Sequence, residues 1–194
     1  MIKFENVSKV YPNGTRGLED INLEIEQGEF VGIIGTSGAG KSTLIRTINA
    51  LNNITAGTLI VNDTDVAKLK GKGLREFRKH VGMIFQSYNL VPRVSVIRNL
   101  LSSRVPNMSF LKVCFGLFSK EDKLKALDAL NRVGILDKAY IRADQLSGGQ
   151  QQRVSLARAL AQDADILLAD EPVAALDPVT AREVMDDFKR INQE

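Results

Sequence analysis

Cysteine is scarce in this sequence and long apolar runs are absent, which excludes a disulfide within the chain, a membrane-spanning helix and a signal peptide in these residues. A single cysteine, Cys114, cannot form a disulfide within the chain. No uninterrupted apolar run approaches the roughly 18 residues that span a bilayer, and the first residues, Met1–Glu5, lack the long apolar stretch of a signal peptide. We therefore expect a cytoplasmic protein that would serve a membrane only through a partner.

The sequence also has little net charge. The 26 lysine and arginine residues nearly balance the 23 aspartate and glutamate residues, which leaves a net charge of +3. That excess is too small to indicate a nucleic-acid partner by itself, and none is expected. With 44% hydrophobic and 25% charged residues, the 194-residue composition is that of a globular chain with one sizeable core.

Apolar patterning predicts the strands. Residues 18–26 alternate apolar and polar side chains, and residues 2–11 read as another strand before a turn at Pro12-Asn13-Gly14. A short strand is expected over 58–61. Continuous apolar runs are typical of strands buried on both faces, and they cover residues 30–34, 81–85 and 166–169.

Helices are expected from about Lys41 and over residues 74–79, 150–161 and 178–191. Ser119 is a candidate N-cap for a further helix, because apolar residues recur after it at near-helical spacing. We therefore predict one α/β domain covering residues 1–194. It would have a mostly parallel core sheet, an antiparallel N-terminal β part and a helical subdomain inserted over about residues 87–145.

A glycine-rich string with the pattern G-x-x-x-x-G-K-[ST] lies between a predicted strand and a predicted helix. Its residues are Gly35, Thr36, Ser37, Gly38, Ala39, Gly40, Lys41 and Ser42. Such glycines let backbone N–H groups point inward, and the helix start adds positive character, so the string suits the phosphates of ATP. Lys41 would contact the outer phosphates, and the Ser42 hydroxyl would bind Mg²⁺. The alternative is a glycine-rich turn that matches by accident.

Two carboxylates, Asp170 and Glu171, end the apolar run 166–169. A buried strand gains nothing structurally from paired acids at its tip, whereas a hard cation and an attacking water do. Asp170 is therefore predicted to orient Mg²⁺ and Glu171 to act as general base. An acid-rich helix N-terminus is the alternative for the pair alone, but both motifs together indicate a P-loop NTPase.

Leu146-Ser147-Gly148-Gly149-Gln150, together with these two motifs, resembles the ABC ATPases. On its own the string could be a glycine turn capped by serine, and at a helix start it forms a second anion site. The resemblance implies a homodimer packed head to tail, in which Ser147, Gly148, Gly149 and Gln150 of one subunit cover the ATP held by the other.

The resemblance also assigns roles to further residues. Tyr11 stands where an aromatic stacks on adenine, or is simply a core aromatic; Gln86 stands where a glutamine touches Mg²⁺ and the attacking water, or is a solvated loop residue. Asp177 matches an acid at the dimer contact and can equally cap a helix before Pro178. Thr43 is included in the nucleotide site, and Ala174 departs from the family pattern, which has serine there.

Segments of the helical part give a narrower resemblance, to the ATP-binding subunits of bacterial phosphonate importers. These segments are 88–93, 98–101, 116–118 and 143–146. The resemblance implies integral membrane permease subunits as partners, a solute-binding protein acting indirectly, and a peripheral location on the cytoplasmic side of the cell membrane. Other importers, lipoprotein-release or cell-division systems, and soluble ABC ATPases acting on DNA, ribosomes or metal clusters are the alternatives, as is a non-hydrolysing regulatory cassette.

Three features stay open. The apolar segment 110–118 is either a contact for the permease or packing within the helical subdomain, with Cys114 expected to be a buried thiol. His80 is expected to be a surface residue at a helix end rather than the family's switch histidine, which follows Glu171. Because no apolar strand or histidine follows the predicted helix 178–191, the chain is expected to be incomplete at its C-terminus and poorly active alone.

Overall fold

The computed structural model describes residues 1–193, which group into two compact units. The first unit comprises Met1–Arg78 and the end of the last helix from Lys189 onward, and the second comprises Lys79–Phe188. None of the helices described over residues 1–193 combines the length and apolar character of a membrane span.

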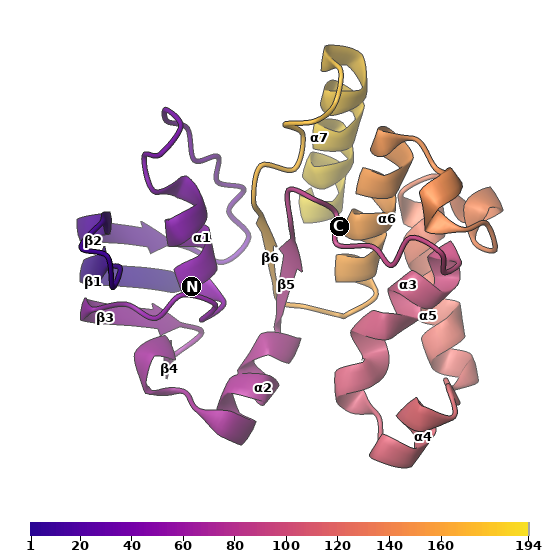
Figure 1. Ribbon diagram of the computed structural model, residues 1–194, viewed down its shortest axis with the longest axis horizontal. Coiled ribbons are helices and arrows are strands. Elements are labelled where there is room, and N and C mark those ends of the chain that lie inside the picture. Colours follow the sequence, from indigo (N-terminus) through magenta and orange to yellow (C-terminus); the bar gives the residue numbers. More distant parts are fainter. Residues whose placement is uncertain (194) are drawn as a thin grey trace. The chain divides into compact units, whose positions relative to one another are not determined.

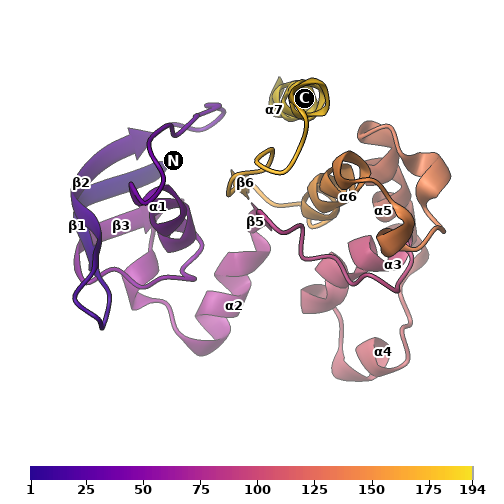
Figure 2. The ribbon, with the colours of Figure 1, turned by 45° about the horizontal axis from the view of Figure 1, so that its top comes forward.

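An antiparallel sheet forms the first unit, with the strands in the order β2-β1-β3-β4. Its strands are β1 (Ile2–Val10), β2 (Arg16–Ile25), β3 (Ala56–Val61) and β4 (Thr64–Asp65). Figures 1 and 2 show helix α1 (Lys41–Ile48) against one face of this sheet. The unit also contains the 3₁₀ turn η1 (Val66–Lys68) and helix α2 (Gly71–Lys79). The predicted antiparallel N-terminal part is thereby confirmed.

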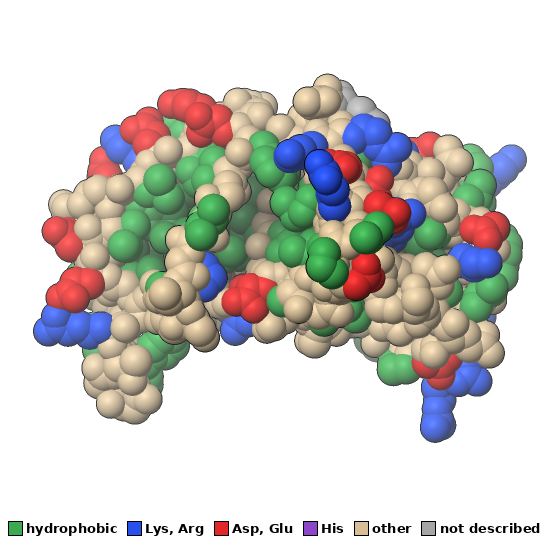
Figure 3. Space-filling view, turned by 90° about the horizontal axis from the view of Figure 1, so that it is seen from above, with side chains coloured by type: hydrophobic (Ala, Val, Ile, Leu, Met, Phe, Trp, Pro, Cys, Tyr) green, Lys and Arg blue, Asp and Glu red, His purple; other side chains and the backbone are tan. Residues whose placement is uncertain are grey.

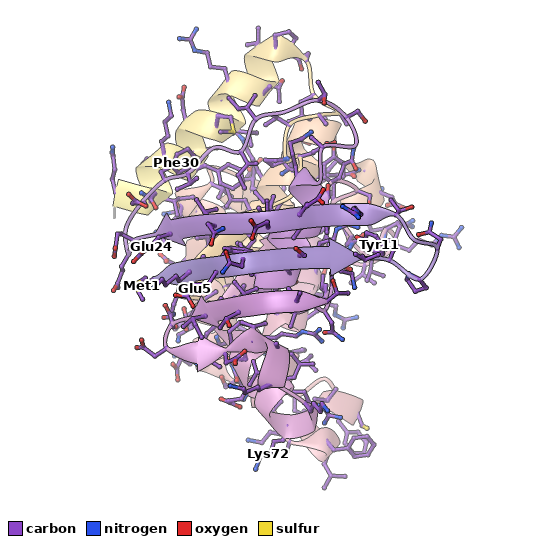
Figure 4. All side chains as sticks on the ribbon, turned by 90° about the vertical axis from the view of Figure 1, so that its left-hand side faces the viewer. Met1, Glu5, Tyr11, Glu24, Phe30 and Lys72 are labelled. Atoms are coloured by element: carbon purple, nitrogen blue, oxygen red, sulfur yellow. The ribbon has the colours of Figure 1, made fainter. Side chains whose placement is uncertain are left out.

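The sheet core and the first turn follow from the sequence pattern. Phe4, Val7 and Leu59 are at most 2% exposed, since alternate residues of β1 and β3 face inward. The predicted turn is present: the Gly14 N–H donates to the Tyr11 carbonyl at 2.9 Å. Figure 4 places Tyr11 at the far end of β1 from Met1, close to this turn.

Residues 30–34 were expected to be a buried strand, and that prediction is wrong. No strand is assigned there, and Phe30, Val31 and Ile34 are 44%, 47% and 98% exposed. A strand requires a neighbour for its backbone N–H and C=O groups. Within residues 1–193, the pairings are β1 with β2 and β3, β3 with β4, and β5 with β6, so residues 30–34 have none.

The second unit contains the parallel part of the fold, the pair β5 (Val81–Ile84) and β6 (Ile166–Ala169). Val81 pairs with Ile166 and Ile84 with Ala169, so both strands end at the same edge. Both strands were predicted from their apolar runs. The helices and 3₁₀ turns that accompany them are α3 (Val96–Leu101), η2 (Ser102–Asn107), α4 (Phe110–Cys114), α5 (Lys120–Arg132), η3 (Leu136–Lys138), η4 (Ala143–Gln145), α6 (Gly148–Leu160) and α7 (Pro178–Gln193).

Helices α3, α5 and α6 pack together around a second apolar core. Leu100, Leu130 and Leu156, one from each helix, are completely buried. The predicted N-cap at Ser119 is confirmed, because its hydroxyl accepts from the Asp122 N–H at 3.0 Å. Hydrogen bonds from Ser119 and, secondarily, from Arg104 lower the pKa of Asp122. Arg104 also bridges to the end of α6 at the Ala161 carbonyl, 3.2 Å away.

Apolar side chains around α4 are exposed rather than packed. We call Phe110, Leu111, Phe115 and Leu117 the α4 cluster; they are 80%, 68%, 74% and 61% exposed. The alternative of packing within the helical part is therefore wrong for these residues. Cys114 is exposed as well, which contradicts the expected buried thiol. Helix α4 has only five residues, and none of them is buried, because so short a helix makes little more than one turn and offers no extended apolar face for packing.

Candidate functional site

The glycine-rich loop of the first unit closes around its own lysine. The Lys41 ammonium donates to the Gly35 carbonyl at 2.9 Å and to the Thr36 carbonyl at 2.8 Å. Gly40 has φ 92°, and a Cβ there would lie 2.4 Å from the Gly17 carbonyl oxygen. Only glycine meets both constraints. Residues 35–39, which include Ser37, Gly38 and Ala39, remain exposed.

Helix α1 begins directly after this loop in a way that favours an anion. Among residues 1–193 no side chain caps its start, and no acidic residue lies in its first turn. The first N–H groups and the helix dipole therefore present positive character beside Lys41 and Ser42. This combination of glycine backbone, lysine and helix start fits the phosphates of a nucleotide.

Tyr11 lies beside the first turn of α1. Its hydroxyl is 3.0 Å from the Thr43 hydroxyl and accepts a hydrogen bond from the Asn52 side-chain amide at 3.2 Å. The ammonium of Lys9 lies 5.2 Å from the ring centroid, within cation–π range. Tyr11 is half-buried, so it packs within this unit and part of its surface stays exposed.

In the second unit, the ends of β5 and β6 bring three predicted residues together. The Asp170 side chain is 1% exposed, and its backbone N–H donates to the Ile84 carbonyl at 3.0 Å. The Gln86 side-chain amide donates to the Glu171 carboxylate at 2.8 Å. Glu171 itself is exposed and has φ 51°, a conformation that residues with a Cβ adopt at a cost. The exposed Glu171 carboxylate is therefore held by Gln86, on a residue whose backbone is strained.

Ser147 begins α6 with a reciprocal capping box. Its hydroxyl accepts from the Gln150 N–H at 3.3 Å, and the Gln150 side chain accepts from the Ser147 N–H at 3.1 Å. Ser147 and Gly148 are exposed. A Cβ on Gly149 would lie 2.4 Å from the Thr180 methyl carbon, so glycine is required for α6 to approach α7. Ser147–Gln150, which we call the signature segment, is thus a helix N-terminus that is exposed at Ser147 and Gly148 and packs against Thr180 at the start of α7.

Asp177 caps α7, as one of its two readings predicted. Its carboxylate accepts from the backbone N–H groups of Val179 and Thr180, both at 3.1 Å. A side-chain hydrogen bond with Thr180 is the first cause that lowers the pKa of Asp177, and the backbone bonds from Thr180 and Val179 lower it further. The cap leaves the side chain exposed, so a contact with a second subunit is compatible with it.

Several residues near these segments were not found from the sequence. Arg158 of α6 holds the loop after Gln86, and Asn52 holds Tyr11. Neither belongs to a recognisable motif, so no signal in the sequence marks them. His80 is confirmed as a surface residue just after α2, where its ring nitrogen lies 2.9 Å from Asp165.

The metal ligands predicted for Mg²⁺ come from different segments, with Ser42 in the first unit and Gln86 and Asp170 in the second. In the described part of the chain, His, Cys, Asp and Glu side chains form no group of three that could hold a metal ion. By chemical type alone, a hydroxyl, an amide oxygen and a carboxylate are ligands that a hard cation takes alongside phosphate oxygens and water.

Comparisons with known proteins agree on the family. The family model described as ABC transporter matches residues 18–174. The phosphonates import ATP-binding protein PhnC of Lactococcus lactis strain IL1403 is 80% identical over the whole chain, which covers 79% of that protein. PhnC of Staphylococcus aureus strain MRSA252 is 60% identical over 193 residues, which cover 75% of it.

Solved structures give the same result for the fold. The ATP-binding cassette MJ0796, a dimer in a post-hydrolysis state bound to ADP and Pi, superposes with a TM-score of 0.85 at 36% identity. The match covers 99% of this chain and 83% of that one. CbiO1 of Clostridium perfringens, part of the transporter complex cbiONQ, gives 0.85 at 30% identity and covers 99% and 73%. With the loop, the strand-end carboxylates and the signature segment, these matches show that the chain belongs to the ABC transporter family.

Proposed function

We propose that this chain is the ATP-binding and ATP-hydrolysing subunit of an ABC importer for phosphonates. The observation that carries the proposal is the loop closed around Lys41 at the uncapped start of α1, which is built for phosphates. The PhnC relatives, at 59% to 80% identity across the chain, support phosphonates as the imported class.

The residues divide the work as follows. Residues 35–43 hold the phosphates, and Tyr11 takes the adenine. Ser42, Gln86 and Asp170 hold Mg²⁺, which supplies charge neutralisation at the phosphates when bound. Glu171 accepts the proton of the attacking water, and the 2.8 Å bond from Gln86 orients its carboxylate for this task.

A second copy of the chain completes each site in this proposal. The exposed N-terminus of α6, Ser147 to Gln150, covers the nucleotide of the partner subunit, and Asp177 lies at the dimer contact. The dimeric MJ0796 cassette supports this arrangement. Integral membrane permease subunits receive the energy, a solute-binding protein delivers the solute to them, and the ATPase is peripheral on the cytoplasmic side of the cell membrane.

Nucleic acid is not among the proposed partners. Figure 3 shows lysine, arginine, aspartate and glutamate side chains interspersed on the face it presents, rather than basic groups gathered alone. That pattern agrees with the net charge of +3. Sequence-independent binding to a phosphate backbone relies on clustered positive charge.

Calorimetric titration with ATP tests the proposal. Lys41→Ala should weaken ATP binding at least about tenfold, because charged hydrogen bonds contribute about 1.5–3 kcal/mol each. Removal of Mg²⁺ with a chelator should weaken binding by the unchanged chain. Lys68→Ala is the matched control, since Lys68 is exposed in the same unit and pairs with Asp65 at 2.8 Å. Equal ATP affinity in Lys41→Ala and Lys68→Ala would refute the nucleotide site.

A further inference from the structure

The loop that follows Gln86 contains two consecutive residues in the left-handed region. Tyr88 has φ 60° and Asn89 has φ 48°, and neither is glycine. L-residues visit this region singly and at a cost, so a pair in succession requires support from outside the loop. Local bonds give only part of it: the Tyr88 N–H reaches the Phe85 carbonyl at 3.0 Å, and the Asn89 N–H reaches the Ser87 carbonyl at 2.6 Å.

Helix α6 supplies the outside support through Arg158. One guanidinium nitrogen donates to the Asn89 carbonyl at 2.5 Å, and the other terminal nitrogen donates to the Tyr88 carbonyl at 2.8 Å. The Ser155 hydroxyl, one turn earlier, adds a bond of 3.3 Å to the same Tyr88 carbonyl. A planar fork that bridges two adjacent carbonyls fixes the relative orientation of both peptide groups.

Arg158 is partly buried around these bonds. Burial lowers the pKa of its guanidinium, and the side chain nevertheless stays charged because an arginine in a protein does not lose its proton. Partial burial of this cation costs desolvation free energy, and the hydrogen bonds to the loop carbonyls offset part of that cost. The two guanidinium bonds that the side chain makes to this loop, at 2.5 Å to Asn89 and 2.8 Å to Tyr88, both go to backbone carbonyls.

The same loop contacts α6 at its other end. The Tyr88 hydroxyl lies 3.5 Å from the position that a Cβ on Gly148 would take. Tyr88 is thus held through its carbonyl by the end of α6 and lies through its side chain beside the signature segment at the start of α6. Gln86, two residues before Tyr88, donates to Glu171.

We propose that Arg158 is a positioning residue for hydrolysis: it fixes the Tyr88–Asn89 turn, and through that turn it sets Gln86 against Glu171. The inference rests on the proposed ATPase function. Because α6 is one continuous helix, a displacement of Ser147 is transmitted to Arg158 and hence to the loop that carries Gln86. Closure of a second subunit on the signature segment is thereby coupled to the orientation of the general base.

Hydrogen exchange in the absence of nucleotide measures how strongly Arg158 stabilises the Tyr88–Asn89 turn. In Arg158→Gln the backbone amides of Tyr88 and Asn89 should exchange about tenfold faster, because the support of the strained turn is lost. Arg158→Lys keeps the charge but not the fork, and it should give a smaller acceleration. Arg153→Lys is the matched control, since Arg153 lies on the same helix and pairs with Glu183 at 3.0 Å instead. Unchanged exchange in Arg158→Gln and Arg158→Lys would overturn the proposal.

Steady-state hydrolysis by the protein assembled with its permease separates positioning from a merely structural role. Arg158→Lys should lower kcat about tenfold with KM for ATP changed less than about twofold, while Arg153→Lys hydrolyses normally. In a Gln86→Ala background, Arg158→Lys should cost less than about twofold more, because the two residues act as one unit. Losses that multiply in the double variant, or a rise in KM alone, would overturn the proposal. Absence of hydrolysis by the unchanged protein would instead refute the proposed function, and the exchange data would then decide the role of Arg158.

Discussion

At the scale of single residues, Glu171 combines exposure, a strained backbone and one hydrogen bond from Gln86 at 2.8 Å. Glu171→Gln keeps the shape but removes the proton acceptor, so hydrolysis should slow by about 10²–10⁴-fold while ATP affinity stays within about twofold. Single-turnover assays with labelled ATP provide the measurement. Glu183→Gln, which changes an exposed carboxylate paired with Arg153, is the control. Turnover of Glu171→Gln close to that of the control would exclude Glu171 as the base.

Residues with a motif could be predicted from the sequence, and residues without one could not. Asp170 and Glu171 were recognisable because acids at the end of an apolar run conflict with burial unless they have a chemical role. Arg158 lies in a helix with ordinary composition, and only the path of the Gln86 loop reveals its use. Cys114 was placed wrongly because a small thiol gives no indication of whether neighbours cover it.

At the scale of elements, the start of α6 and the start of α5 offer a direct comparison. Ser147 and Ser119 each form a capping box, so an arginine at either position should cost about 1 kcal/mol of helix stability. Only Ser147→Arg should also block ATP-dependent dimerisation, because its segment is proposed to cover the partner's nucleotide. ATP binding by the single subunit should be nearly unchanged in both variants.

Light scattering on a Glu171→Gln background, where ATP persists, distinguishes the two caps. Ser119→Arg should form the same amount of dimer with ATP as the parent, and Ser147→Arg should remain monomeric. If both variants dimerise alike, the head-to-tail assignment of the signature segment is wrong.

Helix α5 also has a pH-dependent anchor. The folded-state pKa of Asp122 is lowered, first by Ser119 and then by Arg104, so its contribution to stability is complete above the unfolded pKa of about 3.9. That contribution is lost as the pH falls through the lower folded value. Asp122→Asn should therefore reduce the free energy of unfolding at pH 7 by about 1–3 kcal/mol, and the difference from the unchanged chain should shrink below about pH 4.

Denaturant titrations at several pH values measure this difference. Asp128→Asn is the matched control, because Asp128 is exposed on the same helix and should change stability little at any pH. A gap between Asp122→Asn and the unchanged chain that stays constant down to pH 2 would contradict the assigned cause.

Helices and strands were predicted correctly where the signal lies within a few residues. The prediction failed where strand formation depends on a neighbouring strand. The caps at Ser119 and Ser147 and the run 166–169 act within a few residues, and the structure has them as expected. Residues 30–34 have the same apolar character as 166–169, yet they lack a pairing neighbour in the described chain and stay exposed. Apolar composition shows that a segment can form a strand, but a neighbouring strand must supply the partners for its backbone hydrogen bonds.

At the scale of the whole molecule, the motifs of the sequence predicted the family, which the match over residues 18–174 confirms. The single domain over residues 1–194, the helical insertion over about 87–145 and the poor activity of the chain alone stay predictions. The described residues group into two compact units, with Met1–Arg78 and the end of α7 in the first and Lys79–Phe188 in the second. The order of the motifs is enough to identify the family, because each motif serves the same ligand. The limits of a domain depend instead on how segments pack against one another, and the motifs carry no information about that packing.

At the same scale, the exposure of the α4 cluster supports one of the two alternatives for segment 110–118, a contact for the permease, and that contact stays a prediction. Four large apolar side chains exposed by 61% to 80% within eight residues are unusual unless a partner covers them. Burial of a phenylalanine side chain contributes about 1.5–3 kcal/mol. Phe110→Asp with Phe115→Asp should therefore reduce the recovery of permease at least about tenfold in co-purification, while ATP binding by the subunit stays unchanged. Tyr140→Asp, at a side chain 76% exposed outside the cluster, is the matched control. Equal recovery with the double variant and with Tyr140→Asp would show that the permease binds elsewhere.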